Sequence, residues 1–184
     1  MIHDPELVDK LSSYDPVEYA GEVFRATRKG LDPTAFSTSG GRWAPRNGPA
    51  VLYTSLEPEG ALAEIAFHWG QFNPRPSKPA ILNRLKVESN RSLRLLRGDL
   101  LSLDVEVGRY PETNYERKQS IGSAVSFLEF DGLLVPCARW DCENFVLFAD
   151  NQSESNRLEL IASEAKDWLT WARDNNCLPD FDEE

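Results

Sequence analysis

Four side chains of kinds that often carry chemistry occur within forty residues of sequence. They are Arg25, Arg42, Tyr53 and Glu64. Guanidinium groups bind anionic oxygens through charge-assisted hydrogen bonds, and an aromatic ring can stack on a flat cationic group. A carboxylate can stabilise positive charge that develops in a transition state, or it can orient a nucleophile. Taken singly, each residue also fits an ordinary role, as a solvent-facing arginine, a core tyrosine or an exposed glutamate.

Other catalytic and metal-binding patterns have little support. The two histidines are His3, close to the first residue, and His68, so a histidine-dependent mechanism would rest on one side chain. Cys137 and Cys142 have a C-x4-C spacing without a second pair or a histidine cluster, which does not indicate a zinc site. The glycine-rich motifs of P-loop and Rossmann proteins are missing from the sequence. We therefore expect no metal ion.

Hydrophobic spacing predicts the elements that would position the four residues. Residues 22–28 and 50–55 have strand-like patterns, which places Arg25 and Tyr53 on two strands. The intervening segment, residues 37–48, is rich in Gly, Ser and Pro and should be a polar loop that carries Arg42. Pro58 suits the first turn of a helix, and apolar residues at helical spacing extend it to about Trp69, with Glu64 on it.

The rest of the chain adds strands and two further helices. We expect strands over residues 80–87, 92–96, 132–136 and 144–148, and a helix over about 114–130. Apolar residues recur at helical spacing near the C-terminus, which predicts a final amphipathic helix over about residues 156–175. Together these elements predict an α+β fold with small mixed sheets flanked by helices.

Composition restricts the class of protein and its partners. A length of 184 residues fits a single domain, 1–184, and 41% hydrophobic residues are enough for a buried core. The net charge of −10, from 20 basic and 30 acidic residues, argues against binding to nucleic acid. We see neither a membrane-length apolar run nor a leader peptide, and three cysteines are too few for a disulfide framework. We expect a cytoplasmic protein with reduced thiols and no membrane partner.

Short motifs along the chain resemble the RES-domain family, which is named for its Arg, Glu and Ser. Four motifs contain the four residues above: FRAT at 24–27, GGRW at 40–43, VLYT at 51–54 and ALAEI at 61–65. Later motifs follow in the family's order: QSIG at 119–122, DGLLVPCARW at 131–140 and ENFVLF at 143–148. The resemblance covers about residues 23–148, and the ordered set is more specific than any single motif.

The resemblance implies a fold similar to ADP-ribosyltransferase toxins and cleavage of the nicotinamide–ribose bond of NAD by hydrolysis or phosphorolysis. It assigns Arg25, Arg42, Tyr53 and Cys137 to NAD binding, and Glu64 with Arg42 to catalysis. Arginines suit the pyrophosphate, aided by an anion nest of loop amides near Gly40 and Gly41. Tyr53 suits the departing pyridinium, and Glu64 suits the oxocarbenium-like ribose.

The resemblance also implies partners. Such proteins are commonly toxins of bacterial toxin–antitoxin pairs, so we expect NAD as substrate, inorganic phosphate in the phosphorolytic case, and a helix-turn-helix antitoxin.

Cys137 departs from the family pattern, which has a serine after the Val-Pro step. A thiol can replace the hydroxyl as a small pocket wall with poorer hydrogen bonds, so we expect a retained but altered activity. As a nucleophile the thiol would need its pKa lowered by a neighbour, and the candidates are Arg139 and His68.

Two alternative functions stay open at the level of sequence. An ADP-ribosyltransferase would pass ADP-ribose to a protein or small molecule through the same oxocarbenium step, and sequence does not separate the two reactions. A catalytically silent binding module is favoured by the cysteine at position 137 and by an acidic C-terminal third.

Overall fold

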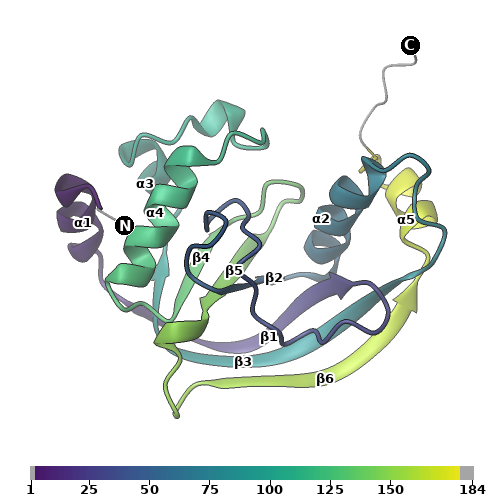
Figure 1. The fold of residues 1–184 in the computed structure, drawn as a ribbon, viewed down its shortest axis with the longest axis horizontal. Coiled ribbons are helices and arrows are strands. Elements are labelled where there is room, and N and C mark those ends of the chain that lie inside the picture. The colour runs from purple at the N-terminus through teal and green to yellow at the C-terminus, as the bar shows by residue number, and fades with distance from the viewer. Residues whose placement is uncertain (1–2, 179–184) are drawn as a thin grey trace.

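The structure, a computed structural model, describes residues 3–178, and within that range six strands form one curved sheet beneath two groups of helices (Figure 1). The strands are β1 (Val17–Thr27), β2 (Val51–Ser55), β3 (Ala80–Arg94), β4 (Gly132–Pro136), β5 (Glu143–Phe148) and β6 (Arg157–Lys166). The helices are α1 (Pro5–Ser12), α2 (Pro58–Gly70), α3 (Arg97–Ser102), α4 (Glu116–Phe127) and α5 (Trp168–Asp174), with 3-10 turns at Val107–Arg109 and Ala149–Asn151. The mixed α+β fold agrees with the prediction from sequence.

Hydrogen bonding between the strands runs in a ring. The order is β1–β2–β5–β4–β3, and β3 also pairs with β1 in antiparallel register, up to Thr27 opposite Ile81. The link between β1 and β2 is a single residue pair, Phe24 opposite Ser55. β3 is parallel to β4, and β6 lies outside the ring along β3. The ring is therefore almost open between β1 and β2.

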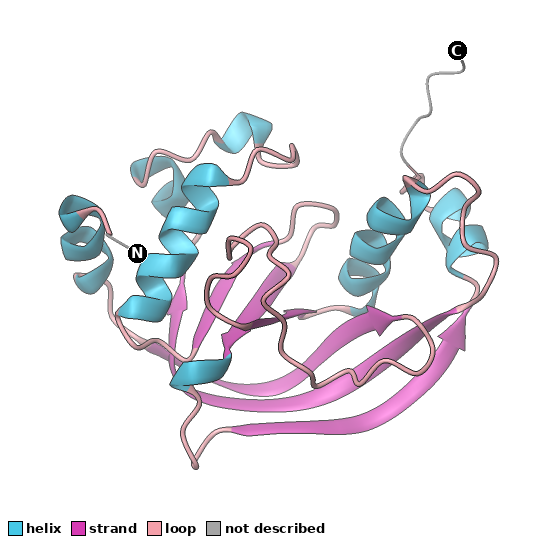
Figure 2. Cartoon of the chain, viewed as in Figure 1, coloured by secondary structure: helices cyan, strands magenta, loops and turns pink. Residues whose placement is uncertain are grey.

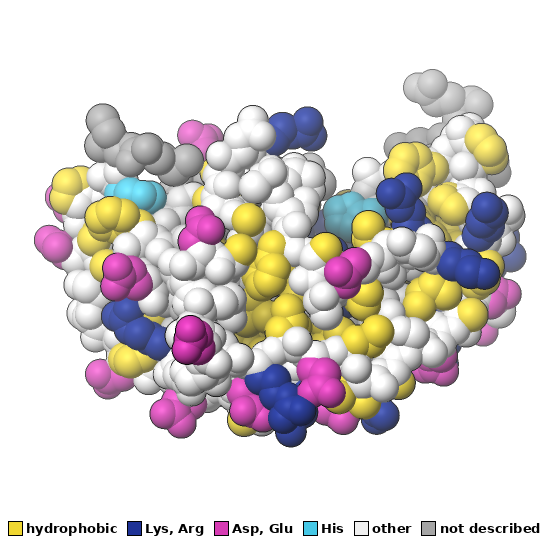
Figure 3. All heavy atoms as spheres, turned by 60° about the horizontal axis from the view of Figure 1, so that its bottom comes forward, with side chains coloured by type: hydrophobic (Ala, Val, Ile, Leu, Met, Phe, Trp, Pro, Cys, Tyr) yellow, Lys and Arg dark blue, Asp and Glu magenta, His cyan; other side chains and the backbone are white. Residues whose placement is uncertain are grey.

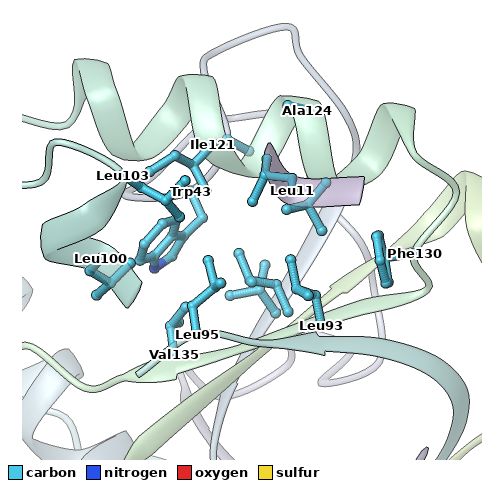
Figure 4. Packing of buried hydrophobic residues seen from close by; sticks show 14 of the residues in the cluster. Leu11, Trp43, Leu93, Leu95, Leu100, Leu103, Ile121, Ala124, Phe130 and Val135 are labelled. Atoms are coloured by element: carbon cyan, nitrogen blue, oxygen red, sulfur yellow. The ribbon is translucent and has the colours of Figure 1, made fainter. Parts of the chain in front are cut away.

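The largest hydrophobic core lies between the sheet and the group formed by α1, α3 and α4 (Figures 1 and 4). Trp43 comes from the loop between β1 and β2 and is only 1% exposed; its ring lies among residues that include Leu103 and Ile121. The close approach of this loop to α4 requires glycine at position 122, because a Cβ there would lie 1.8 Å from the carbonyl oxygen of Trp43. Trp43 thus anchors its loop to the core.

The second group of helices, α2 and α5, packs at the opposite end of the concave face (Figure 2). Trp168 of α5 is buried against Ile65 and Ala66 of α2, and its ring meets that of Trp69 edge-on at 5.5 Å. This packing fixes α2 on the sheet.

The sequence prediction is wrong for the last segment. Residues 156–175 do not form one helix: β6 pairs antiparallel with β3, and the short helix α5 begins only at Trp168, where the Asp167 side chain caps it by accepting the Thr170 N–H. β6 buries none of its side chains, so its stability comes from backbone hydrogen bonds to β3, which hydrophobic spacing does not reveal. The two strands expected over 80–87 and 92–96 are likewise the single strand β3.

The surface carries charges of both signs. Figure 3 shows acidic and basic side chains interspersed on one face of the molecule, with hydrophobic side chains toward its middle. Pairs such as Arg84–Glu22 and Arg157–Glu88 join neighbouring strands at 3.6 and 3.7 Å. Among the described helices, none is long and apolar enough to cross a membrane.

Candidate active site

A cavity of about 810 Å³ is lined by residues of β1, β2, α2 and the loop between the two strands. It adjoins the place where β1 and β2 share one residue pair. Arg25, Arg42, Tyr53 and Glu64 all line it, so the structure brings together residues from two strands, a loop and a helix. Their common location favours a functional role over four unrelated structural ones.

Arg25 is a half-buried side chain on β1. Its Nη1 donates to the carbonyl oxygens of Pro33 (2.9 Å) and Ala35 (3.1 Å) in the following loop. Burial lowers the pKa of Arg25, and the nearby Asp32 carboxylate opposes this change. The guanidinium is therefore held at the cavity wall by backbone carbonyls.

Arg42 is almost fully buried, with 8% of the residue exposed. Its Nη1 donates to the carbonyl oxygens of Tyr110 (2.6 Å) and Glu112 (3.3 Å), and the guanidinium lies over the rings of Tyr115 and Tyr110, at 4.7 and 5.2 Å. Among the described residues, these contacts are with neutral groups and not with a carboxylate. An anionic ligand would therefore meet an uncompensated charge here.

Tyr53 connects β2 to the glycine loop. Its hydroxyl oxygen accepts the backbone N–H of Trp43 at 3.0 Å, and a Cβ at Gly41 would come within 2.8 Å of the same oxygen. Burial raises the pKa of Tyr53 to about 12, so the phenol is neutral at physiological pH. The Gly41 N–H donates to the carbonyl of Ala44 at 2.8 Å. The Gly41 N–H is therefore already hydrogen-bonded, and it cannot contribute to the anion nest expected near Gly40 and Gly41.

Glu64 points from α2 toward the β4–β5 side of the sheet. Its Oε1 accepts hydrogen bonds from Asn144 Nδ2 (3.3 Å) and from the Cys137 thiol (3.5 Å). Asn144 in turn accepts the Ser55 hydroxyl at 2.7 Å, which fixes its amide. The carboxylate is thus oriented by neutral donors at the cavity wall.

A family model for the RES domain matches residues 22–171 of the chain. The chain belongs to the RES-domain family. No curated protein matches it in sequence. Among solved structures, a chain in the crystal structure of the M. tuberculosis MbcT–MbcA toxin–antitoxin complex is similar, with a TM-score of 0.79 and 19% identity over 92% of this chain and 97% of that one. At this identity the similarity is one of fold. The match to the family model extends the RES domain past the motifs, through β6 into α5.

Cys137, where the resemblance led us to expect a serine in contact with NAD, does not line the cavity but contacts the Glu64 carboxylate. The residue is buried, and its sulfur accepts the Arg139 N–H at 3.5 Å besides donating to Glu64. A hydrogen bond from the Cys142 thiol lowers the pKa of Cys137, while burial and Glu64 oppose it. In this RES domain the thiol is placed to position Glu64.

Two further cations, Arg139 and Lys118, lie near Arg42 without lining the cavity. Arg139 lies over the Phe67 ring at 3.4 Å, and its Nε and Nη2 are buried with no hydrogen-bond partner among the described residues. Lys118 of α4 is buried near Arg42 and lies over the Tyr110 and Tyr115 rings; burial, followed by Arg42, lowers its pKa. With Arg42 these groups give the region an excess of positive charge over Glu64.

Sequence reasoning missed Asn144, Tyr115 and Lys118, and it considered His68 only as a neighbour that could lower the pKa of Cys137, where the causes of the shift do not include it. Asn144 lies in the ENFVLF motif, which was the one signal for it. His68 lines the cavity one helical turn after Glu64; burial lowers the pKa of its imidazole, and Glu64 opposes the shift. The His68 side chain is therefore mainly neutral near pH 7. Within the described residues no cluster of three or more metal-binding side chains occurs.

Proposed function

We propose that this protein is a toxin-type enzyme that cleaves the nicotinamide–ribose bond of NAD by hydrolysis or phosphorolysis. The observation that carries the proposal is the single cavity lined by Arg25, Arg42, Tyr53 and an oriented Glu64. Membership of the RES-domain family and a fold like that of a toxin–antitoxin structure support it. A volume of about 810 Å³ suits a ligand of dinucleotide size.

The positive side of the cavity would bind the dinucleotide. Arg42 meets no carboxylate among its described contacts, so the pyrophosphate of NAD would supply the missing negative charge. Arg25, held by two loop carbonyls, would provide a second cation at the wall. The neutral ring of Tyr53 would lie against the cationic pyridinium.

Glu64 would act on the ribose. As the C–N bond breaks, its electron pair leaves with nicotinamide, and the sugar gains oxocarbenium character that a nearby carboxylate stabilises. Water or phosphate then attacks the anomeric carbon, and Glu64 can accept the proton of an attacking water. Asn144 and Cys137 would keep the carboxylate aligned through both steps.

Purified protein without an antitoxin tests the reaction. Incubation with NAD should release nicotinamide, with ADP-ribose as the second product in phosphate-free buffer or ADP-ribose 1-phosphate when phosphate is present. The phosphate dependence of the rate separates hydrolysis from phosphorolysis. ADP-ribose attached to a protein would instead identify a transferase, and intact NAD with correctly folded protein would leave a silent binding module.

A toxin of this kind would act in the cytoplasm and need an antitoxin. The neighbouring gene is expected to encode a helix-turn-helix protein that covers the cavity. Expression of the chain alone in a bacterium should deplete NAD and stop growth, and co-expression of the neighbouring gene should restore both. Normal growth and NAD at high levels of folded protein would contradict the toxin proposal.

A further inference from the structure

Cys137 and Cys142 face each other across the β4–β5 hairpin. The antiparallel register runs to Pro136 opposite Glu143, so one further step places the two cysteines opposite each other. The Cys137 N–H donates to the Cys142 carbonyl at 2.8 Å, and the neighbouring Cys142 side chain lowers the pKa of the Cys137 thiol. Both are free thiols.

This arrangement meets the geometric requirement for a disulfide. Directly opposed residues of an antiparallel pair have Cα atoms about 4.5 to 5.5 Å apart. Here one backbone bond joins the two cysteines, because the Cys142 N–H donates to the Trp140 carbonyl instead. Disulfides form between cysteines whose Cα atoms are roughly 4.4 to 6.8 Å apart, so the bond would need little movement of the backbone.

The pair lies between the hairpin and the helix that carries the carboxylate. Cys142 is partly exposed, and its sulfur packs so closely on α2 that a Cβ at Gly60 would lie 2.5 Å away. Glu64 is one helical turn after Gly60, and it accepts the hydrogen bond of the Cys137 thiol. Because the Cys142 S–H favours the thiolate of Cys137 by lowering its pKa, Cys137 is the better nucleophile of the two.

We propose that Cys137 and Cys142 form a modification site, at which a peroxide converts the two thiols into a disulfide that disconnects Cys137 from Glu64. The Cys137 sulfur attacks the peroxide O–O bond of H₂O₂, which gives a sulfenic acid and water. The Cys142 sulfur then displaces the hydroxyl group, which leaves as a second water with the remaining thiol proton. Peroxide is reduced, and the two sulfurs are oxidised.

The consequence for activity rests on the proposed function. Oxidation removes the S–H that Cys137 donates to Glu64, so the carboxylate keeps Asn144 as its donor and loses the thiol. The loss of one hydrogen bond to a charged group at the reacting centre predicts about a tenfold fall in NAD cleavage. A thiol reductant should reverse it.

Counting thiols tests the modification separately from the activity. Reduced protein should take up three alkylating labels under denaturing conditions, and protein treated with stoichiometric H₂O₂ should take up one, at Cys177. Peptide mapping should then identify a Cys137–Cys142 link. Cys142→Ser should form no such link, because its oxidation stops at the sulfenic acid of Cys137, whereas Cys177→Ser, remote from the pair, should form the link like the wild type.

Uptake of three labels after peroxide, or a link that includes Cys177, would overturn the proposal. A Cys137–Cys142 link in a protein that does not cleave NAD would leave the modification site standing and remove the proposed function. NAD cleavage that is insensitive to a formed link would refute the control of Glu64 by this pair.

Discussion

The hydroxyl of Tyr53 accepts the backbone N–H of Trp43 at 3.0 Å, and this bond joins β2 to the loop that carries Arg42. Trp43 is buried in the core on the other side of that loop. The backbone between the two anchors therefore has little freedom, and the Arg42 guanidinium is presented to the cavity in one position.

Tyr53→Phe should lower the free energy of unfolding by about 1–2 kcal/mol at pH 7, because the Trp43 N–H loses its acceptor. Folding raises the pKa of Tyr53 from 10.0 to about 12, so the unfolded chain loses this proton first. Wild-type stability should therefore fall as the pH rises from 10 toward 12, and the variant should lack this contribution. Urea unfolding across this range measures both effects. Tyr14→Phe, outside the cavity, is the control, and an equal change there would remove the special role of Tyr53.

Glu64→Gln should reduce kcat for NAD cleavage by about 10²–10³-fold while changing KM little, because the amide keeps the shape but lacks the charge that stabilises the transition state. Steady-state kinetics with detection of the released nicotinamide measures kcat and KM separately. Glu59→Gln, on the first turn of the same helix, should have no such effect. A variant at Glu64 with full turnover would remove it from the mechanism.

Arg42→Lys should raise the KM for NAD about tenfold or more, since an ammonium group cannot donate to Tyr110 O and Glu112 O and also present a planar fork to phosphate. Calorimetry of NAD binding, with Arg42→Lys introduced into the Glu64→Gln variant, measures the affinity without turnover. Arg46→Lys, four residues later and exposed, is the matched control. Comparable losses at both positions would indicate a diffuse basic loop instead of a defined contact.

Asp131→Asn should destabilise the fold by about 2–3 kcal/mol, because the buried carboxylate accepts hydrogen bonds from Ser89 and Arg91 of β3 and from Asn156 before β6. Burial alone would raise the pKa of Asp131, but these bonds outweigh it and lower the pKa. As the pH falls below about 4, the unfolded chain therefore binds the proton first, and wild-type stability declines. Unfolding titrations from pH 7 to 3 should show a smaller decline for the variant; an identical profile would contradict this role.

The elements around the cavity could be predicted because each has a local signature. β2 is a short apolar run, Pro58 marks the start of α2, and the glycine loop has the composition of irregular backbone. The position of Asn144 could not be predicted in this way. It faces Glu64 because β5 pairs with β2 with Asn144 opposite Ser55, a register that depends on the whole sheet.

The same limit explains the error at the C-terminus. β6 is held by its backbone along β3, and Leu160 and Ile161 remain 44% and 41% exposed. The spacing of these apolar residues therefore reflects no buried face, and a helix was the wrong interpretation. The contact of Cys137 with Glu64 spans seventy-three positions of sequence and likewise depends on tertiary structure.

The single residue pair between β1 and β2 makes the cavity wall deformable at low cost. Within the described chain, Phe24 opposite Ser55 is the one residue pair that links β1 to β2, whereas β2 is paired with β5 along its whole length. A dinucleotide that separated the two strands would break one residue pair of the sheet and leave the packing around Trp43 unchanged. Under the proposed function, substrate entry would then not require unfolding of the core, and amide hydrogen exchange within β2 should be fastest on its β1 side.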